Sequence, residues 1–168
     1  AGVALRKFPQ ANASWTENAV RVYRAIDIAV AVNTPAGLIA PIVRQVDRKS
    51  LDVISLELRD LTVRARDGKL QPEEYTGGTF TVSNLGMFGV ESLYAIVNPP
   101  QSAILGVGAA SQRPVVRDGE VMVGTSLTCT LSADHRTIDG VIGAEFLAEI
   151  QRLIETPSLL SAAIPGSR

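Results

Sequence analysis

The chain has 168 residues, of which 46% are hydrophobic and 20% charged, and its 16 basic and 17 acidic side chains give a net charge of −1. These values are typical of one globular domain with its own apolar core, and they exclude a largely disordered chain. The balanced charge disfavours a nucleic-acid-binding protein. One cysteine and one histidine exclude an internal disulfide and a multi-cysteine zinc site, and the lack of a long apolar run predicts no membrane span.

The first residues resemble the end of an element rather than its beginning. The chain does not begin with methionine, and the apolar residues Val3 to Leu5 ahead of Pro9 have the pattern of the last turn of a helix. We therefore expect a fragment or a processed product.

Two strands are expected next. Over 26–32 the large apolar residues alternate with Ala and Asp, which is the period of a strand. A turn-rich segment at 33–37 leads into a second expected strand at 38–43. Pro41 within this second strand predicts an edge position or a bulge, because proline has no backbone N–H to donate.

A helix follows over 51–66. Ser50 is a suitable N-cap, apolar residues recur at three- and four-residue spacing, and Gly68 can adopt the left-handed conformation that ends a helix. The next two short β-rich segments, 79–83 and 102–107, are expected strands.

The last third predicts a hairpin, a strand and a helix. Asp118-Gly119 marks the turn of a hairpin over 115–121, and alternation over 127–132 predicts a further strand. An apolar stripe over 142–153 predicts a helix that stops at Thr156, before a proline. This order of several strands and two or three helices indicates an α+β fold.

The most informative polar residues lie between that last strand and helix. Asp134, His135, Arg136 and Asp139 fall within six residues, and an imidazole with a pKa of about 6.5 suits a general base near neutral pH. Local explanations are also available. Asp139 suits the N-cap of the final helix, Asp134 and Arg136 suit an exposed ion pair, and a lone His at a strand end is often structural.

The chain is similar to a known family in three places. The pattern His-x-x-x-Asp-Gly at His135 and Asp139 resembles the signature of the dihydrolipoamide acyltransferases, which chloramphenicol acetyltransferase shares. Segments 77–90 and 98–108 are similar to two further conserved blocks of the family. The blocks resemble most those of the pyruvate dehydrogenase complexes, with branched-chain and acetoin relatives close behind.

This resemblance implies a fold and an activity. The implied fold is an α+β two-layer sandwich of chloramphenicol-acetyltransferase type, with a mixed sheet, helices on one face, and a trimeric assembly. The implied activity is transfer of an acetyl group between dihydrolipoamide and coenzyme A in a 2-oxoacid (pyruvate) dehydrogenase complex, whose oligomeric core the domain also builds. Residues 1–168 would then be the catalytic core domain truncated at its N-terminus, without the lipoyl and peripheral-subunit-binding domains.

The resemblance also implies the site. His135 matches the family histidine that takes the thiol proton, and Ser83 matches the serine whose hydroxyl stabilises the oxyanion. Asp139 matches the residue, acidic or amide, that holds the shape of the site through a charged hydrogen bond. Ser83 and His135 would come from different subunits, and no acyl-enzyme intermediate would form.

The implied ligands and partners follow from the same resemblance. Coenzyme A would be a substrate, the lipoyl group would be carried on a separate domain, and no metal is expected. Partners would be two further copies of the chain within a larger core, the lipoyl domain, the 2-oxoacid decarboxylase and dihydrolipoamide dehydrogenase, with no nucleic acid and no membrane. The compartment would be the mitochondrial matrix or the bacterial cytoplasm.

Two alternatives to this activity stay open. One is a non-catalytic scaffold component that binds dihydrolipoamide dehydrogenase, which the short N-terminus favours; the other, weaker, is an antibiotic acetyltransferase. Cys129 shares its strand parity with Leu127 and Leu131, which favours an apolar role over a nucleophilic one.

Overall fold

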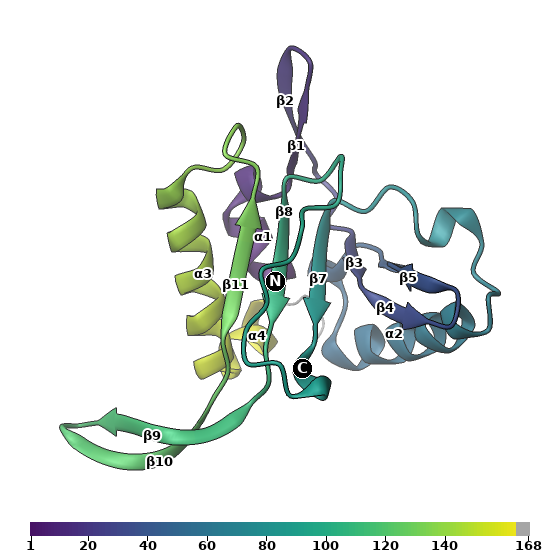
Figure 1. The fold of residues 1–168 in the computed structure, drawn as a ribbon. Coiled ribbons are helices and arrows are strands. Elements are labelled where there is room, and N and C mark those ends of the chain that lie inside the picture. Colours follow the sequence, from purple (N-terminus) through teal and green to yellow (C-terminus); the bar gives the residue numbers. More distant parts are fainter. Residues whose placement is uncertain (164–168) are drawn as a thin grey trace.

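The computed structural model describes residues 1–163, which form a five-stranded mixed sheet, several helices and three two-stranded hairpins (Figure 1). In spatial order the sheet contains β11 (Cys129–Ala133), β8 (Ala103–Val107), β7 (Phe80–Asn84), β3 (Ile28–Val30) and β6 (Ile42–Val43). The hairpins are β1 (Ala13–Thr16) with β2 (Ala19–Val22), β4 (Val32–Thr34) with β5 (Gly37–Ile39), and β9 (Ser111–Arg117) with β10 (Glu120–Ser126). The longer helices are α2 (Leu51–Arg66) and α3 (Gly140–Glu155), and the short ones are α1 (Gly2–Lys7) and α4 (Ser158–Ala163).

The sheet combines parallel and antiparallel pairs. β7 lies parallel to both β3 and β8, whereas β6 and β11 are antiparallel edge strands. Parallel neighbours need crossover connections. The first of these, from β3 to β7, contains the β4–β5 hairpin and α2. The predicted α+β fold with a mixed sheet is confirmed.

The apolar core lies between the sheet and the helices. Phe80 of β7 and Phe146 of α3 are fully buried, and their rings meet edge to face with centroids 5.7 Å apart. Burying such a side chain contributes about 1.5–3 kcal/mol. The predicted stripe of the last helix is the face that supplies Phe146, and Thr156 ends that helix as expected. α1 and α3 contact each other on this face, as expected for helices that cover one side of the sheet.

α2 lies at the β6 edge of the sheet, where it contacts β4 and β6 (Figure 1). Ser50 caps it as expected, since the Ser50 hydroxyl accepts the Val53 N–H at 3.4 Å, and Gly68 takes a φ of 67° just beyond its end. Leu61 joins the core, but Leu51, which the apolar spacing assigned to the buried stripe, is 58% exposed. Leu51 is the first residue of the helix, where the chain has only just joined the helical stripe.

The strand expected over 26–32 is divided in the structure. β3 belongs to the main sheet, whereas β4 pairs with β5 as a separate hairpin. The return segment is divided in the same way, with Pro41 at the step between β5 and β6. Pro41 accepts the Val30 N–H at 2.9 Å and has none of its own to offer, so it suits this step, and β6 is an edge strand as Pro41 predicted.

The β9–β10 hairpin is longer than expected and extends away from the sheet (Figure 1). Asp118 and Gly119 form its turn with φ values of 52° and 84°, which is the conformation the Asp-Gly pair predicts. The helical turn at the N-terminus is present as α1. The β1–β2 hairpin and α4 were not expected from the sequence.

Candidate active site

Ser83 lies on the face of β7 opposite the one that α1 and α3 cover. Side chains alternate along a strand, so Phe80 and Val82 enter the core while Thr81 and Ser83 point the other way. On that side Ser83, which is half-buried, lines an open groove of about 910 Å³. Leu38, Ile96 and Asn98 are among its other lining residues.

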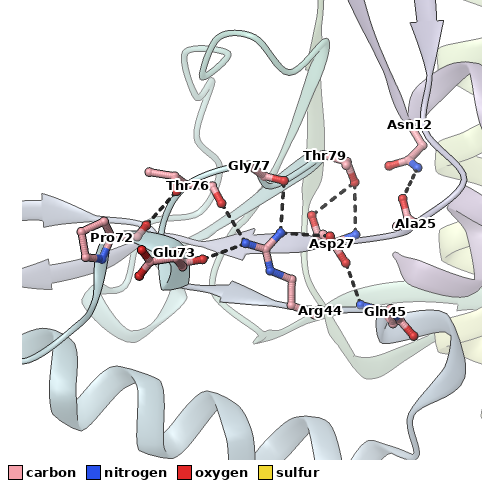
Figure 2. Close-up of polar contacts among 10 residues, drawn as sticks. All are labelled: Asn12, Ala25, Asp27, Arg44, Gln45, Pro72, Glu73, Thr76, Gly77 and Thr79. Carbon is pink, nitrogen blue, oxygen red and sulfur yellow. Dashed lines mark hydrogen bonds and ion pairs between the residues drawn. The ribbon is translucent and has the colours of Figure 1, made fainter.

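The start of β7 is held by a polar network around Arg44 (Figure 2). The Arg44 guanidinium donates to the backbone carbonyls of Glu73 and Thr76 at 2.8 Å and of Gly77 at 3.3 Å. It also forms an ion pair with Asp27 at 3.0 Å. One side chain therefore fixes the loop that leads into the strand carrying Ser83.

Asp27 completes this network (Figure 2). Its carboxylate also accepts the Gln45 N–H at 2.8 Å, and its backbone exchanges hydrogen bonds with Thr79, the residue before β7. Gln45 has a φ of 48°, and the contact with Asp27 helps to hold that left-handed conformation. No motif in the sequence marks Asp27 or Arg44, because both lie far along the chain from segments 77–90 and 98–108 and meet only after folding.

A connecting segment crosses the sheet close to this groove. Gly106 of β8 is next to Ser83 in the register, and a Cβ at Gly106 would lie 2.7 Å from the Leu93 carbonyl oxygen. Thr130 of β11 donates to the same Leu93 carbonyl. Only glycine at position 106 lets the 91–98 segment approach so closely.

His135 lies in a tight turn between β11 and α3, with its side chain exposed. Asp134 organises this turn through its backbone. Its N–H donates to the Ser102 carbonyl at 2.8 Å, and its carbonyl accepts the N–H groups of Thr137 at 2.9 Å and Ile138 at 3.0 Å. The turn is thus tied both to itself and to the segment before β8.

Asp134 and Arg136 form the ion pair that the sequence suggested as a local explanation for them. Arg136 donates to the Asp134 carboxylate from Nε and Nη2, with a shortest distance of 2.7 Å, and its guanidinium lies 5.2 Å from the centre of the Trp15 ring. These hydrogen bonds hold the pKa of the Asp134 carboxyl below its usual value. A pocket of about 440 Å³, lined by Trp15, Arg136 and Pro99 among others, opens beside the pair.

Asp139 is the N-cap of α3. Its carboxylate accepts the Ile142 N–H at 2.9 Å, and its backbone has the extended conformation usual at this position. The interpretation of Asp139 as an N-cap is therefore confirmed, and the cap fixes the start of α3 at Gly140, five residues after His135.

Ser83 and His135 do not meet within one chain. In the register Ser83 is level with Gly106, and Gly106 is level with Thr130, three residues before the end of β11. The turn with His135 follows that end, so the two backbones are more than about 10 Å apart along the strands and about 10 Å apart across them. A shared site for both side chains requires a second copy of the chain.

Cys129 is partly buried against the core, and burial raises the pKa of its thiol. A raised pKa lowers the thiolate fraction, which agrees with the expected apolar role.

Within residues 1–163, no group of three or more His, Cys, Asp or Glu side chains is placed to hold a metal ion. None of the helices described is long and apolar enough to cross a membrane.

The chain resembles known proteins over nearly all its length. Residues 1–162 match the family model of the 2-oxoacid dehydrogenases acyltransferase (catalytic domain). The chain is 50% identical over 157 residues to the dihydrolipoyllysine-residue acetyltransferase component of the pyruvate dehydrogenase complex of Rickettsia bellii. It is 52% identical over 155 residues to the same component of Rhizobium meliloti, and a mitochondrial relative from Dictyostelium discoideum is 49% identical.

Solved structures agree with this similarity. The dihydrolipoamide acetyltransferase of Azotobacter vinelandii superposes with a TM-score of 0.90 at 37% identity, and covers 94% of this chain. The cubic core of a pyruvate dehydrogenase multienzyme complex gives a TM-score of 0.90 at 36% identity. This chain spans 66% of each of those solved chains, and 38% and 35% of the Rickettsia bellii and Rhizobium meliloti proteins.

Proposed function

Because the chain belongs to the 2-oxoacid dehydrogenases acyltransferase (catalytic domain) family, we propose that it moves an acetyl group between dihydrolipoamide and coenzyme A in a pyruvate dehydrogenase complex. In this proposal the domain also builds the core of that complex. The lipoyl group arrives on a separate domain, and the 2-oxoacid decarboxylase and dihydrolipoamide dehydrogenase bind elsewhere on the assembly. The compartment is the bacterial cytoplasm or the mitochondrial matrix, since the relatives include bacterial proteins and one named as mitochondrial.

The spacing of three residues carries the proposal. The structure of the Azotobacter vinelandii enzyme is described as a study of one serine, one histidine and one asparagine in its catalytic mechanism. The histidine follows the serine by 52 residues and the asparagine follows the histidine by four. Ser83, His135 and Asp139 have the same two spacings in this chain, with aspartate in place of asparagine.

The proposed chemistry is thioester exchange. A thiol with a free pKa near 8.5 is mostly protonated at neutral pH, so His135 takes its proton as the sulfur attacks the acetyl carbonyl carbon. The Ser83 hydroxyl donates to the oxyanion of the tetrahedral intermediate. When this intermediate collapses, the carbon–sulfur bond to the first thiol breaks, and the departing thiolate takes the proton back from the imidazolium. Ser83 therefore forms no covalent bond.

Two copies of the chain supply one site in this proposal. The groove beside Ser83 is open, and His135 is exposed at the other end of the sheet. A head-to-tail contact would place the His135 turn of one copy against the Ser83 groove of the next, and repetition of such a contact closes a ring such as a trimer. Trimers can then assemble into a larger core.

Mixed assemblies test the chemistry and the shared site together. The assay is acetyl transfer from acetyl-coenzyme A to dihydrolipoamide by the full-length polypeptide in its native assembly. His135→Ala and Ser83→Ala alone should each be nearly inactive. Co-assembled, they should regain about a quarter of the wild-type rate, because some interfaces combine an intact His135 with an intact Ser83 from different copies.

The alternatives give other results. If mixing restores nothing while each single variant is inactive, both groups come from one copy, or the assembly does not exchange subunits, which native mass measurement of the mixture distinguishes. If the wild-type assembly is intact and transfers no acetyl group, the proposed reaction is wrong and a scaffold role replaces it.

A further inference from the structure

We propose that Asp134, Arg136 and Trp15 form a clamp that orients the His135 imidazole, which makes them positioning residues of the acetyl-transfer site. This inference rests on the function proposed above, because it gives these residues a role only through the base His135. It adds a role for three side chains that act on His135 and not on the thiol or the acetyl group.

Two residues of the clamp are the immediate sequence neighbours of His135. Asp134 and Arg136 are its two neighbours, and they are joined by a two-pronged ion pair and by the Arg136 N–H, which donates to the Asp134 carboxylate at 3.0 Å. The peptide units on both sides of His135 are therefore fixed relative to each other. A guanidinium suits this purpose because its donors have a rigid planar arrangement.

The clamp is also attached to the body of the domain. Trp15 lies in the β1–β2 hairpin, more than a hundred residues earlier in the chain. The Arg136 guanidinium lies over its ring in a cation–π contact. Ser102 links the same two regions, because its N–H donates to Ala13 at 3.1 Å and its carbonyl accepts from Asp134 at 2.8 Å. The His135 turn is thus held at its side chains and at its backbone.

The exposure of the ion pair indicates that it orients the turn more than it stabilises the folded state. The Arg136 side chain is 61% exposed and that of Asp134 is 22% exposed, and exposed pairs add little to folding free energy. Orientation of a base is sensitive to small displacements, because proton transfer needs a short and well-directed contact. Loss of the clamp should therefore reduce turnover without unfolding the domain.

Variants of the full-length protein in its native assembly test this role. Arg136→Ala should lower kcat for acetyl transfer about tenfold and leave KM for coenzyme A and dihydrolipoamide unchanged, because His135 acts in the chemical step. Arg136→Lys should recover only a small part of that loss, because an ammonium group keeps the charge but cannot form the two-pronged pair with Asp134. Trp15→Ala should lower kcat about threefold and Trp15→Phe less, and Trp15→Ala should add nothing to Arg136→Ala if both act through one clamp.

A matched control is available at the end of α2. Lys69 pairs with Asp67 at 2.9 Å across the same two-residue spacing, and both side chains are exposed. Lys69→Ala should leave kcat unchanged. It removes an exposed i, i+2 pair that lies far from His135, so it measures the general effect of losing such a pair.

Backbone hydrogen exchange supplies a readout that does not need activity. In Arg136→Ala the amides of residues 136–138 should exchange at least several-fold faster, with no such change in Lys69→Ala. Unchanged exchange, or wild-type kcat in Arg136→Ala, overturns the clamp. A raised KM for coenzyme A with unchanged kcat also overturns it and assigns Arg136 to substrate binding. A wild-type protein without acetyl transfer overturns the proposed function, and the exchange result then decides whether the clamp orders the turn.

Discussion

The two faces of the five-stranded sheet differ in what covers them. On the helix face, Phe80 and Phe146 are fully buried in a continuous apolar cluster. On the opposite face, the open groove beside Ser83 is bordered by Leu38, 75% exposed, and Ile96, 91% exposed. Consecutive residues of one strand, β7, serve both faces.

This difference separates stability from chemistry. Burial of apolar side chains stabilises the fold from the helix face, while the groove face leaves the Ser83 hydroxyl and apolar side chains such as Leu38 accessible. Substitutions on the two faces should therefore have different consequences. Those on the helix face should change unfolding, and those on the groove face should change turnover.

The largest effect should follow Phe146→Ala. It removes a fully buried ring that contacts Phe80 and Phe8, so the unfolding free energy should fall by about 3–5 kcal/mol. Urea unfolding followed by fluorescence of Trp15, the single tryptophan of the chain, measures the change. Val141→Ala in the same helix, where Val141 is 67% exposed, should change stability little; equal losses would contradict the comparison.

Ser83→Ala should show the reverse pattern. Loss of one oxyanion donor typically lowers kcat by about 10²–10³-fold, whereas removal of a half-buried hydroxyl from the groove face should leave the unfolding free energy nearly unchanged. Steady-state acetyl-transfer kinetics measures kcat, and urea unfolding measures the free energy of unfolding. Ser55→Ala, at an exposed position of α2, is the matched control. Wild-type turnover in Ser83→Ala would remove Ser83 from the mechanism.

Glu149→Gln should change how the stability of the helix face depends on pH. Hydrogen bonds from Arg152 and Lys7 lower the pKa of Glu149 to about 2 from its usual 4.5. The carboxylate therefore stabilises the folded state above pH 4.5, and this contribution is lost as the pH falls through 2. The difference in unfolding free energy between wild type and Glu149→Gln should narrow over that range. A difference that does not vary with pH would contradict it.

Asp139 should show the smallest effect. Asp139→Asn keeps an acceptor for the Ile142 N–H, so stability and turnover should both stay close to wild type, whereas Asp139→Ala should cost about 1 kcal/mol through loss of the cap. Thermal unfolding and the transfer assay measure both variants. Loss of turnover in Asp139→Asn without loss of stability would show that the negative charge itself is needed.

Local signals in the sequence predicted most elements well. Ser50 and Gly68 bounded α2, Asp118-Gly119 placed a hairpin turn, and the final stripe with Thr156 located α3. Each depends on backbone conformation or spacing within a few residues. Alternation over 26–32 predicted one strand where the structure has two, because the alternating pattern is the same in one strand as in two strands that diverge into different sheets.

The candidate site also divides into residues that the sequence marks locally and contacts that only folding creates. The sequence singled out Ser83, His135 and Asp139 through their motifs, and it offered the capping role of Asp139 and the Asp134–Arg136 pair as local alternatives that the structure contains. It did not indicate Trp15 over Arg136, or the Asp27–Arg44 network under β7. Those partners are 17 to more than 100 positions apart, and nothing near them in the chain marks the contact.

The sequence by itself determined which segments are helical or extended and which side chains have suitable chemistry, because propensity, capping and motif spacing are local properties. Only the tertiary structure decided that Ser83 and His135 stand at different levels of the sheet, since that depends on the order and direction of β7, β8 and β11. Strand order is set by long-range packing, which minimises exposed apolar area over the whole domain. The resemblance implied that Ser83 and His135 come from different subunits, and the register of the sheet supplies a physical reason, because it keeps the two residues apart within one chain.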